Sequence, residues 1–258
     1  MGKHSKKKNR IKNKRKFVNS IIQLVLLVIL IYSLIQIIIW YNNNKKSQKI
    51  MNEISNSINI DTDNDNNEVT EDRYEINFSG LKEVNSDIVG FLKVKGTDIE
   101  YPVVKGLNND FYLNHSFDKT SNSAGWIFAD YRNKFDGTDK NTVIYGHNRR
   151  DGSMFFTLKN ILNEEWYNNQ ENLKVKFITE NEETTYEVFS VYQTEAEDYY
   201  IKTSFKDNTE YAKFIETITK RSKNDFNIDV TIEDTVLTLS TCANNNKYRV
   251  VLHAKKIK

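Results

Sequence analysis

The first pattern along the chain is a long apolar stretch near the N-terminus. Residues 17–44 carry no charge, and residues 21–40 within them are mostly Ile, Leu and Val. A helix needs about 20 apolar residues to cross a bilayer, and Trp40 and Tyr41 at the far end suit the membrane–water interface. The pattern therefore predicts a transmembrane signal-anchor helix over residues 17–41.

A cleaved signal peptide is the competing interpretation of this stretch. It predicts a shorter apolar segment that ends in a small-residue cleavage site, whereas the chain runs from Trp40 and Tyr41 into Asn and Lys residues. Residues 1–16, which precede the stretch, hold nine Lys or Arg and no acid. By the positive-inside rule we expect this basic tail in the cytoplasm and the C-terminal bulk outside the cell, on a single-pass anchor in the cell membrane.

A polar segment follows the apolar one. Residues 42–73 are rich in Asn, Asp, Lys and Ser, and the Asp/Asn run at 61–67 is typical of a flexible stalk. A few isoleucines, Ile50 and Ile54 among them, have the spacing of a short amphipathic helix. We expect a stalk or linker over 42–73 and a folded domain over 74–258.

The folded region alternates short apolar runs with turn residues. Eight runs rich in β-branched and aromatic residues are predicted strands. They cover residues 89–94, 99–104, 126–129, 142–145, 173–178, 184–192, 236–240 and 248–253. Eight short strands separated by turns favour a barrel or a sandwich. Pro102, the only proline, lies inside the second run, so we expect that strand to be an edge or a bulged strand.

Helical patterns interrupt these strands at three places. Asp207 has the position of an N-cap with Glu210 three residues later, and the apolar residues that follow it recur at helical spacing. These apolar residues are Tyr211, Phe214, Ile215 and Ile218. We expect this helix to pack on the barrel. Shorter helices are predicted over 154–163 and 81–85.

Charge and cysteine content narrow the classes of function. Beyond the basic tail, 28 basic residues face 35 acidic ones, a net charge of −7. Nucleic-acid binding needs a basic face, which argues against that class. The acidic residues of 61–72 lack the glycine and spacing of an EF-hand, and we expect no metal and no cofactor. With one cysteine the chain forms no internal disulfide, so the domain depends on its core alone.

The single cysteine is followed by an arginine at a spacing that could bring the two side chains together. Cys242 ends an apolar run, and Arg249 lies seven residues further on. If the last two runs form a hairpin with Cys242 opposite Arg249, both side chains project from one face. The guanidinium would then favour the thiolate and offer donors to an oxyanion. A single cysteine is equally typical of a small buried hydrophobe, and Arg249 of an exposed surface arginine.

His147 is the third candidate group. It follows the strand over 142–145, just past Gly146, where a side chain at a strand end can project into a cleft. A thiol with an imidazole and a guanidinium is the minimum set for covalent acyl transfer. A histidine that merely caps the strand end is the alternative. His115, in a predicted loop, and His253, on the last strand, are weaker candidates for chemistry.

Together these residues resemble the sortases, the membrane-anchored cysteine transpeptidases of Gram-positive bacteria. The matching elements, in the family's order, are Tyr145-Gly146-His147-Asn148, Thr238-Leu239-Ser240-Thr241-Cys242 and Arg249. The resemblance covers about residues 75–258 and is closest to class B. The stretches 126–133 and 99–104 and the long helix-containing insertion before the cysteine strand carry the likeness to that class.

The resemblance implies a mainly β fold, an eight-stranded sortase-type barrel with peripheral helices after the N-terminal transmembrane helix. It also implies that the Cys242 thiolate attacks a carbonyl in the C-terminal sorting signal of a secreted protein and forms a thioester. His147 would protonate the leaving group, and Arg249 would stabilise the oxyanion or hold the substrate backbone. An amine of a peptidoglycan precursor or cross-bridge would then resolve the thioester. For class B the expected sorting motif is of Asn-Pro type.

The resemblance further implies a set of substrate-binding residues. They are Asn109, Leu113, Tyr200, Ile201, Thr203 and Ser240. Ordinary packing is the alternative for Leu113, Tyr200 and Ile201. Ala243 follows the cysteine where some class B members carry a polar or acidic residue, so the substrate preference is expected to differ.

Three other functions stay open at this stage. A membrane-tethered adhesin or receptor domain predicts an unreactive thiol and indifference to the loss of His147. A hydrolytic cysteine peptidase predicts cleavage without transfer to an amine. A pilus-polymerising sortase predicts a pilin lysine as the acceptor in place of the cell-wall amine.

Overall fold

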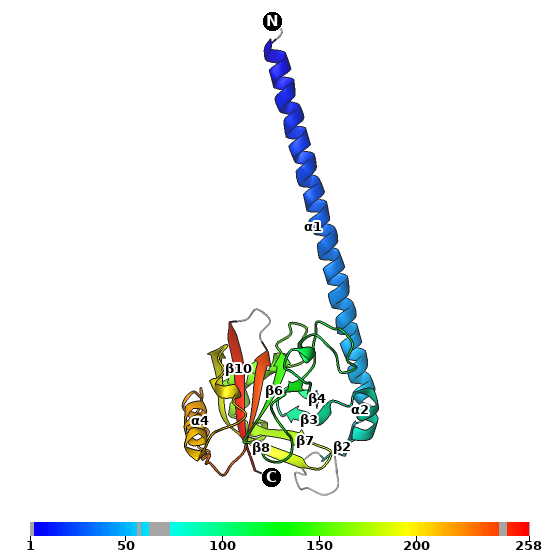
Figure 1. Cartoon of the computed structure of the whole chain (residues 1–258). Helices are drawn as coiled ribbons and strands as arrows, with labels where there is room; N and C mark the ends of the chain where they lie inside the picture. The colour runs from blue at the N-terminus through cyan, green and yellow to red at the C-terminus, as the bar shows by residue number, and fades with distance from the viewer. Residues whose placement is uncertain (1–2, 56–57, 62–72, 243–246, 258) are drawn as a thin grey trace. The chain divides into compact units, whose positions relative to one another are not determined.

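The computed structural model describes residues 3–55, 58–61, 73–242 and 247–257, without the side chains of residues 3–14, 58–61, 73 and 242. It consists of two units, Met1–Lys46 and Ser47–Lys258 (Figure 1). The first unit contains most of helix α1 (Lys3–Ser55). Within the described residues, this is the one helix long and apolar enough to cross a membrane. The predicted apolar helix over 17–41 lies inside it.

The second unit begins earlier than the sequence suggested. Ile50 and Ile54, on the last turns of α1, are only 7% and 4% exposed and belong to the core of this unit. Asn122 Nδ2 donates to Ser47 Oγ at 3.0 Å. The compact unit therefore begins at residue 47 rather than at 74, because the isoleucines expected in a stalk are buried against the domain.

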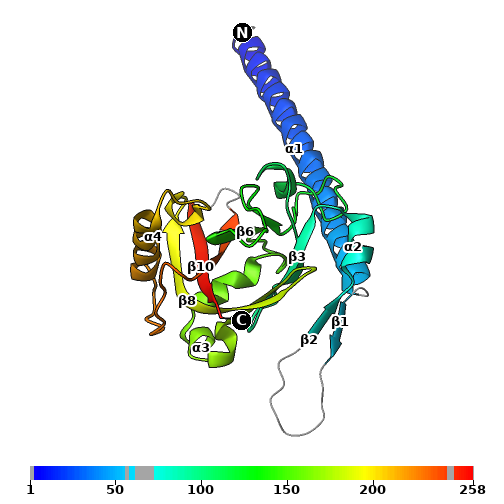
Figure 2. The same cartoon turned by 60° about the horizontal axis from the view of Figure 1, so that its bottom comes forward.

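A two-stranded antiparallel sheet follows α1, made of β1 (Ile58–Asp61) and β2 (Arg73–Ile76). Figure 2 shows it below α2, at the lower right of the view. These residues also fall in or next to the predicted linker of 42–73. The Asp/Asn run between the two strands lies largely outside the described residues, so the flexible stalk expected there stays a prediction.

Eight strands close into a barrel in the order β10-β8-β7-β3-β4-β5-β6-β9. They are β3 (Ile88–Val94), β4 (Glu100–Val104), β5 (Phe128–Ala129), β6 (Asn141–His147), β7 (Lys174–Ile178), β8 (Glu183–Glu195), β9 (Val236–Cys242) and β10 (Tyr248–Lys256). Each predicted strand overlaps one of them. Closure pairs the terminal strands of the sheet with each other, which decides for the barrel over the sandwich.

Pro102 lies where the barrel has a backbone ladder on one side only. It pairs with Phe91 of β3, whereas the pairing of β4 with β5 is confined to Val104 and Phe128. The Pro102 carbonyl accepts a hydrogen bond from the Trp126 indole N–H at 2.9 Å. The expectation that this strand is an edge at the proline therefore holds locally, although the barrel as a whole is closed.

Short helices surround the barrel. The α-helices are α2 (Phe78–Val84), α3 (Glu164–Tyr167) and α4 (Asn208–Lys220), and the 3₁₀ helices are η1 (Phe111–Leu113), η2 (Phe156–Leu162), η3 (Gln170–Leu173) and η4 (Tyr199–Ile201). The Asp207 side chain caps α4 by accepting from the Glu210 N–H at 2.9 Å, as predicted. Phe214 and Ile218 of α4 pack on buried residues of β8, β9 and β10. Figure 1 shows α4 beside β8 and β10. The helix expected over 154–163 is the 3₁₀ helix η2.

Candidate active site

Strands β6 and β9 run parallel and side by side, and their register sets the centre of the site. Tyr145 pairs with Ser240, Gly146 with Thr241, and His147 with Cys242. Paired residues on neighbouring strands project from the same face and lie about 5 Å apart at their backbones. Cys242 and His147 are therefore neighbours in the fold although they are far apart in the sequence. The Cys242 side chain itself lies outside the described residues.

Strand β10 lies on the other side of β9 and carries Arg249. Val251 pairs with Ser240 in the antiparallel β9–β10 ladder. The ladder ends at this pair, and the Val250 N–H donates instead to Thr241 Oγ1 at 3.0 Å. Counted on by two residues, the same register would place Arg249 opposite Cys242, so the predicted hairpin pairing of these two residues stays a prediction. Arg249 is half-buried and donates through Nη1 to the Tyr248 carbonyl at 3.3 Å. Ala243 and the rest of the connection through residue 246 lie outside the described residues.

His147 is held in one orientation by the backbone of η1. The residue is 3% exposed, and its Nε2 lies 2.7 Å from the Leu113 carbonyl oxygen. Because a carbonyl only accepts, Nε2 carries the proton and Nδ1 of the neutral ring carries a lone pair. Nδ1 is buried and has no hydrogen-bond partner among the described residues.

Electrostatics keep this imidazole neutral near pH 7. Burial lowers the pKa of His147, the hydrogen bond to Leu113 raises it in part, and the nearby Arg149 lowers it again. The net shift is downward. The Nδ1 lone pair is therefore available to accept a proton from a neighbouring group.

Two glycines lie where His147 and its strand pack closely against the rest of the protein. A Cβ on Gly125 would lie 2.7 Å from His147 Cδ2 and 2.6 Å from the Tyr112 carbonyl oxygen. A Cβ on Gly146 would collide with Ile127 and Phe155 in the core. Sequence reasoning noted Gly146 only as a residue beside a strand end. In the fold it is the position where the barrel wall packs too tightly for any side chain.

A groove of about 610 Å³ opens beside the paired strand ends. Its lining residues are Asn109, Leu113, Phe128, Tyr145, Ala196, Glu197, Asp198, Tyr200, Ile201, Ser240, Thr241 and Arg249. They come from the segment around η1, from β5 and β6, from the segment around η4, and from the ends of β9 and β10. Arg249 and five of the six predicted substrate-binding residues are thus brought together.

Thr203 is the exception. It is buried and lines a different recess, with Asp207 and Tyr211 at the start of α4. The expectation that Thr203 binds substrate relied on its closeness to Tyr200 in the sequence. After η4 ends at Ile201 the chain leaves the groove toward α4, so that closeness does not carry over into the fold.

Several lining residues are tied to the protein by hydrogen bonds. The hydroxyls of Tyr200 and Ser240 lie 3.2 Å apart. Asn109 donates through Nδ2 to Asp130 at 2.9 Å and accepts through Oδ1 from the Tyr131 N–H at 3.0 Å. Asp130, which does not itself line the groove, could not be identified from the sequence, because its hydrogen-bond partners come from distant segments.

The remaining described histidines have structural surroundings. His253 is fully buried, with Nε2 2.8 Å from the Tyr192 hydroxyl and Nδ1 2.8 Å from Thr238 Oγ1. His115 stacks on the ring of Phe111 and has Nδ1 2.7 Å from the Phe111 carbonyl oxygen. Both arrangements agree with the structural roles that the sequence favoured for them.

Comparison with known proteins places this geometry in a family. The family model described as "Sortase domain" matches residues 92–257. Sortase B of Listeria monocytogenes serovar 1/2a is 34% identical over 250 residues, which cover 94% of this chain and 98% of that protein.

Solved structures agree with the sequence match. The crystal structure of sortase B from Bacillus anthracis in complex with AAEK1 has a TM-score of 0.71 and 35% identity, covering 86% of this chain and 99% of that one. The Staphylococcus aureus sortase B–substrate complex has a TM-score of 0.66 and 35% identity, covering 70% and 84%. The chain therefore belongs to the sortase family, the cysteine transpeptidases of the cell wall, and within that family to class B.

Proposed function

We propose that this sortase cleaves a C-terminal sorting signal on secreted proteins through a Cys242 thioester and transfers the protein to an amine of a peptidoglycan precursor. The observation that carries the proposal is the register of three adjacent strands. It aligns His147 of β6 with Cys242 of β9, and counted on from Val251 and Ser240 it would place Arg249 of β10 opposite Cys242. The groove that Arg249 lines supplies a binding surface for a peptide beside them.

In the first step His147 acts as base and then as acid. Nδ1 accepts the thiol proton of Cys242, and the thiolate attacks the carbonyl carbon of the scissile peptide bond. The carbonyl electron pair moves onto oxygen, where the Arg249 guanidinium stabilises the negative charge. The tetrahedral intermediate collapses to a thioester, and the imidazolium at Nδ1 gives its proton to the departing amine.

In the second step an amine of the cell-wall precursor attacks the thioester carbonyl. Its proton passes to His147 and from there to the departing sulfur, which regenerates the thiol and leaves a new amide bond. The lowered pKa of His147 favours the neutral imidazole in the resting protein. The imidazolium then forms only when Nδ1 takes the thiol proton during the reaction.

The groove favours a peptide as acyl donor. It combines apolar surface from Leu113 and Ile201 with the polar groups of Tyr200, Ser240 and Arg249. A Staphylococcus aureus sortase B has been solved in complex with a substrate, which supports a substrate-binding role for a groove in the similar fold of this chain. We propose that Asn109, Leu113, Tyr200, Ile201 and Ser240 contact a sorting signal of Asn-Pro type.

The first helix supports a proposal for the location of the chain. We propose a single-pass protein of the cell membrane, with residues 1–16 in the cytoplasm and the barrel outside the cell. The basic tail before the apolar helix supports this orientation. The cell-wall amine that resolves the thioester is on the same side as the barrel in this arrangement.

The test uses the full-length protein in detergent, a peptide with an internal Asn-Pro-type motif, and an oligoglycine amine. The wild type is expected to form a thioester and to give the transfer product only when the amine is present. Cys242→Ala should form no thioester while its circular dichroism spectrum is unchanged. His147→Ala is expected to lower the rate by about 10²–10⁴-fold, and Arg249→Ala by about 10²–10³-fold.

Three outcomes would overturn the proposal. Turnover by Cys242→Ala would exclude the thioester. Cleavage at the same rate and with the same hydrolysis product, whether or not the amine is present, would identify a hydrolytic peptidase. A thiol that fails to react with a methanethiosulfonate reagent would point instead to a binding domain.

A further inference from the structure

A buried carboxylate lies behind the groove, outside the catalytic constellation. Asp130 directly follows β5, and its side chain is 0% exposed. Oδ1 accepts from the backbone N–H of Arg132 at 2.9 Å and from Arg132 Nε at 2.8 Å. Oδ2 accepts from Arg132 Nη2 at 2.7 Å, from the Tyr145 hydroxyl at 2.9 Å and from Asn109 Nδ2 at 2.9 Å.

The donors to this carboxylate belong to separate parts of the groove wall. Asn109 comes from the segment before η1, and Tyr145 comes from β6; both line the groove. Arg132 reaches further, because its Nη2 also donates to the Ile201 carbonyl at 2.9 Å. Ile201 belongs to η4, so one ion pair connects three segments of the groove wall.

A second side chain holds the same segment around η4. Asn141 Nδ2 donates to the Lys202 carbonyl at 2.9 Å and lies 3.4 Å from the Tyr200 carbonyl oxygen. Arg132 and Asn141 therefore bind η4 through its backbone. The side chains of Tyr200 and Ile201 are left to line the groove.

The ion pair has the properties of a positioning device. Burial raises the pKa of Asp130, but hydrogen bonds from Arg132, Tyr145 and Asn109 more than offset burial and hold the pKa below its usual value. The carboxylate is therefore ionised, and the planar guanidinium binds it through two nitrogens. Buried ion pairs add little net stability compared with apolar packing, but each allows only one arrangement of its partners.

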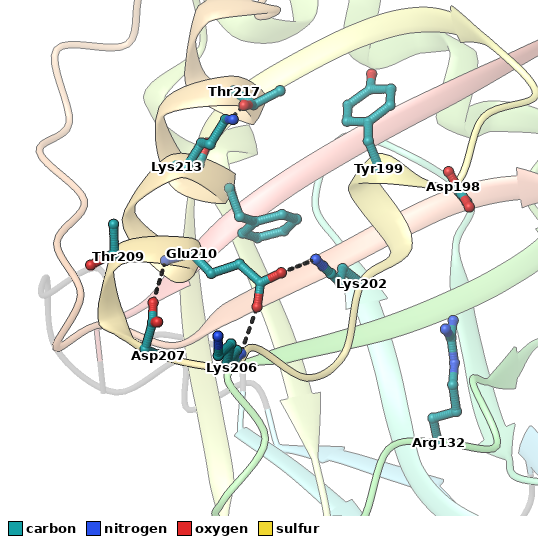
Figure 3. A pocket seen from close by; sticks show the side chains of 11 residues that line it. Arg132, Asp198, Tyr199, Lys202, Lys206, Asp207, Thr209, Glu210, Lys213 and Thr217 are labelled. Atoms are coloured by element: carbon teal, nitrogen blue, oxygen red, sulfur yellow. Dashed lines mark hydrogen bonds and ion pairs between the residues drawn. The ribbon is translucent and has the colours of Figure 1, made fainter.

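Arg132 is also open to solvent on its far side. Its side chain is 40% exposed, and it lines a second recess with Lys202 and residues of α4 (Figure 3). A change at Arg132 therefore removes the connection to Ile201 without opening a cavity in the barrel core.

We propose that Asp130 and Arg132 are the positioning pair of the substrate groove, holding Asn109, Tyr145 and the η4 segment at the spacing that the sorting-signal peptide needs. The proposal rests on the proposed function, because it assigns the groove to the peptide. The pair acts through the groove walls and not on the reacting atoms. Loss of the pair should therefore weaken peptide binding and leave the reactivity of the thiol unchanged.

The experiment compares Asp130→Asn, Arg132→Gln and the double variant in the full-length protein. Each single variant is expected to raise KM for the sorting-signal peptide about tenfold or more, with kcat within about threefold of the wild type. KM of the double variant should not exceed the higher KM of the two single variants, because each single change already breaks the same ion pair. The rate of thiol modification by a methanethiosulfonate reagent should stay within about twofold in all three.

Arg132→Lys tests whether the positive charge alone suffices or whether the shape of the guanidinium is needed. It keeps the positive charge, but a single ammonium cannot replace the guanidinium fork that binds both Asp130 and Ile201. We expect KM to stay raised in this variant. Should Asp130→Asn fail to fold, Arg132→Gln and Arg132→Lys carry the test, since the Arg132 side chain is partly exposed.

The matched control is an ion pair between a buried lysine and a partly exposed glutamate, away from the groove. Lys176 Nζ donates to Glu183 Oε1 at 2.7 Å, and the Lys176 side chain is 5% exposed. Glu183 begins β8, at the opposite end of that strand from Ala196 in the groove. Glu183→Gln is expected to change the urea midpoint without changing KM.

Two results would overturn the positioning role. One is an unchanged KM in Asp130→Asn and Arg132→Gln. The other is a loss of activity that matches the loss of folded protein and thiol reactivity, which indicates a merely structural pair. A wild-type protein that forms no thioester would instead refute the proposed function, so the two failures are distinguishable.

Discussion

Gly125 leaves space for the His147 imidazole, a role that no pattern in the neighbouring sequence indicates. It adopts a positive φ of 62° and lies against the imidazole of His147 and the Leu113 carbonyl that orients it. A Cβ at this position would come within 2.9 Å of that carbonyl oxygen. The hydrogen bond that fixes the tautomer of His147 therefore depends on the absence of a side chain on a separate loop.

Gly125→Ala is expected to lower kcat/KM at least about tenfold, because the imidazole must move away from its position beside Cys242. Gly137 provides the matched control, since it also has a positive φ, 82°, but a Cβ there meets nothing within 4 Å. Both substitutions carry backbone strain of about 1–2 kcal/mol, seen in urea unfolding. Equal activities of the two variants would contradict the role assigned to Gly125.

At the scale of secondary-structure elements, His253 joins three neighbouring strands beneath α4. It belongs to β10 and makes hydrogen bonds with Tyr192 of β8 and Thr238 of β9, and Thr238 Oγ1 also donates to Asn141 of β6 at 2.6 Å. Burial lowers the pKa of His253 to about 3. The ring is therefore neutral in the folded protein across the physiological range.

This histidine makes the fold sensitive to acid. Below pH 6.5 the unfolded chain binds a proton at residue 253 and the folded chain does not, so stability falls as the pH decreases from about 6.5 toward 3. The slope is on the order of 1 kcal/mol per pH unit. In urea unfolding at pH 7 and pH 5, His253→Gln should lose less stability than the wild type. An equal loss would show that other groups cause the pH dependence.

Much of the element structure was predictable from local patterns. The strands have runs of β-branched and aromatic residues, and the N-cap of α4 follows from Asp207 and Glu210. The hairpin of β9 and β10 was also accessible, because adjacent strands with a short connection pair with each other. Thr203 was misplaced because sequence neighbours need not share a surface once the chain turns.

The long-range parts of the site were not predictable in this way. The parallel pairing of β6 with β9 joins distant segments, and no local pattern specifies its register. The five hydrogen bonds to Asp130 come from three segments, so a lone aspartate after a short strand gives no signal of them. The family resemblance supplied the catalytic set that pattern reasoning alone left open.

At the scale of the whole molecule, the chain has an apolar N-terminal helix and a separate folded unit that starts at Ser47. The charges divide in the same way, with the basic tail at one end and a net-acidic remainder. The last turns of α1 belong to the folded unit, since Ile50 and Ile54 are part of its core. Residues expected to act as a spacer therefore contribute to stability.

Replacing Ile50 and Ile54 together with Ala is expected to destabilise residues 47–258 by about 3 kcal/mol or more, because two buried side chains are lost. Lys49 and Glu53 lie on the same turns with largely exposed side chains. Their replacement with Ala is the control and should cost less than about 1 kcal/mol. Urea unfolding measures the stability of both double variants. Equal stabilities of the two would show that this segment is a stalk and not part of the core.

Arg132 and Asn141 hold η4 through its backbone, and this has a consequence for which side chains η4 can carry. Their side chains donate hydrogen bonds to the main-chain oxygens of residues 201 and 202, and every amino acid has such an oxygen. This support therefore places no demand on the side chain at residue 201, which lines the groove. If the groove binds the sorting signal as proposed, exchange of Ile201 should change which peptides are accepted while the backbone of η4 keeps its position.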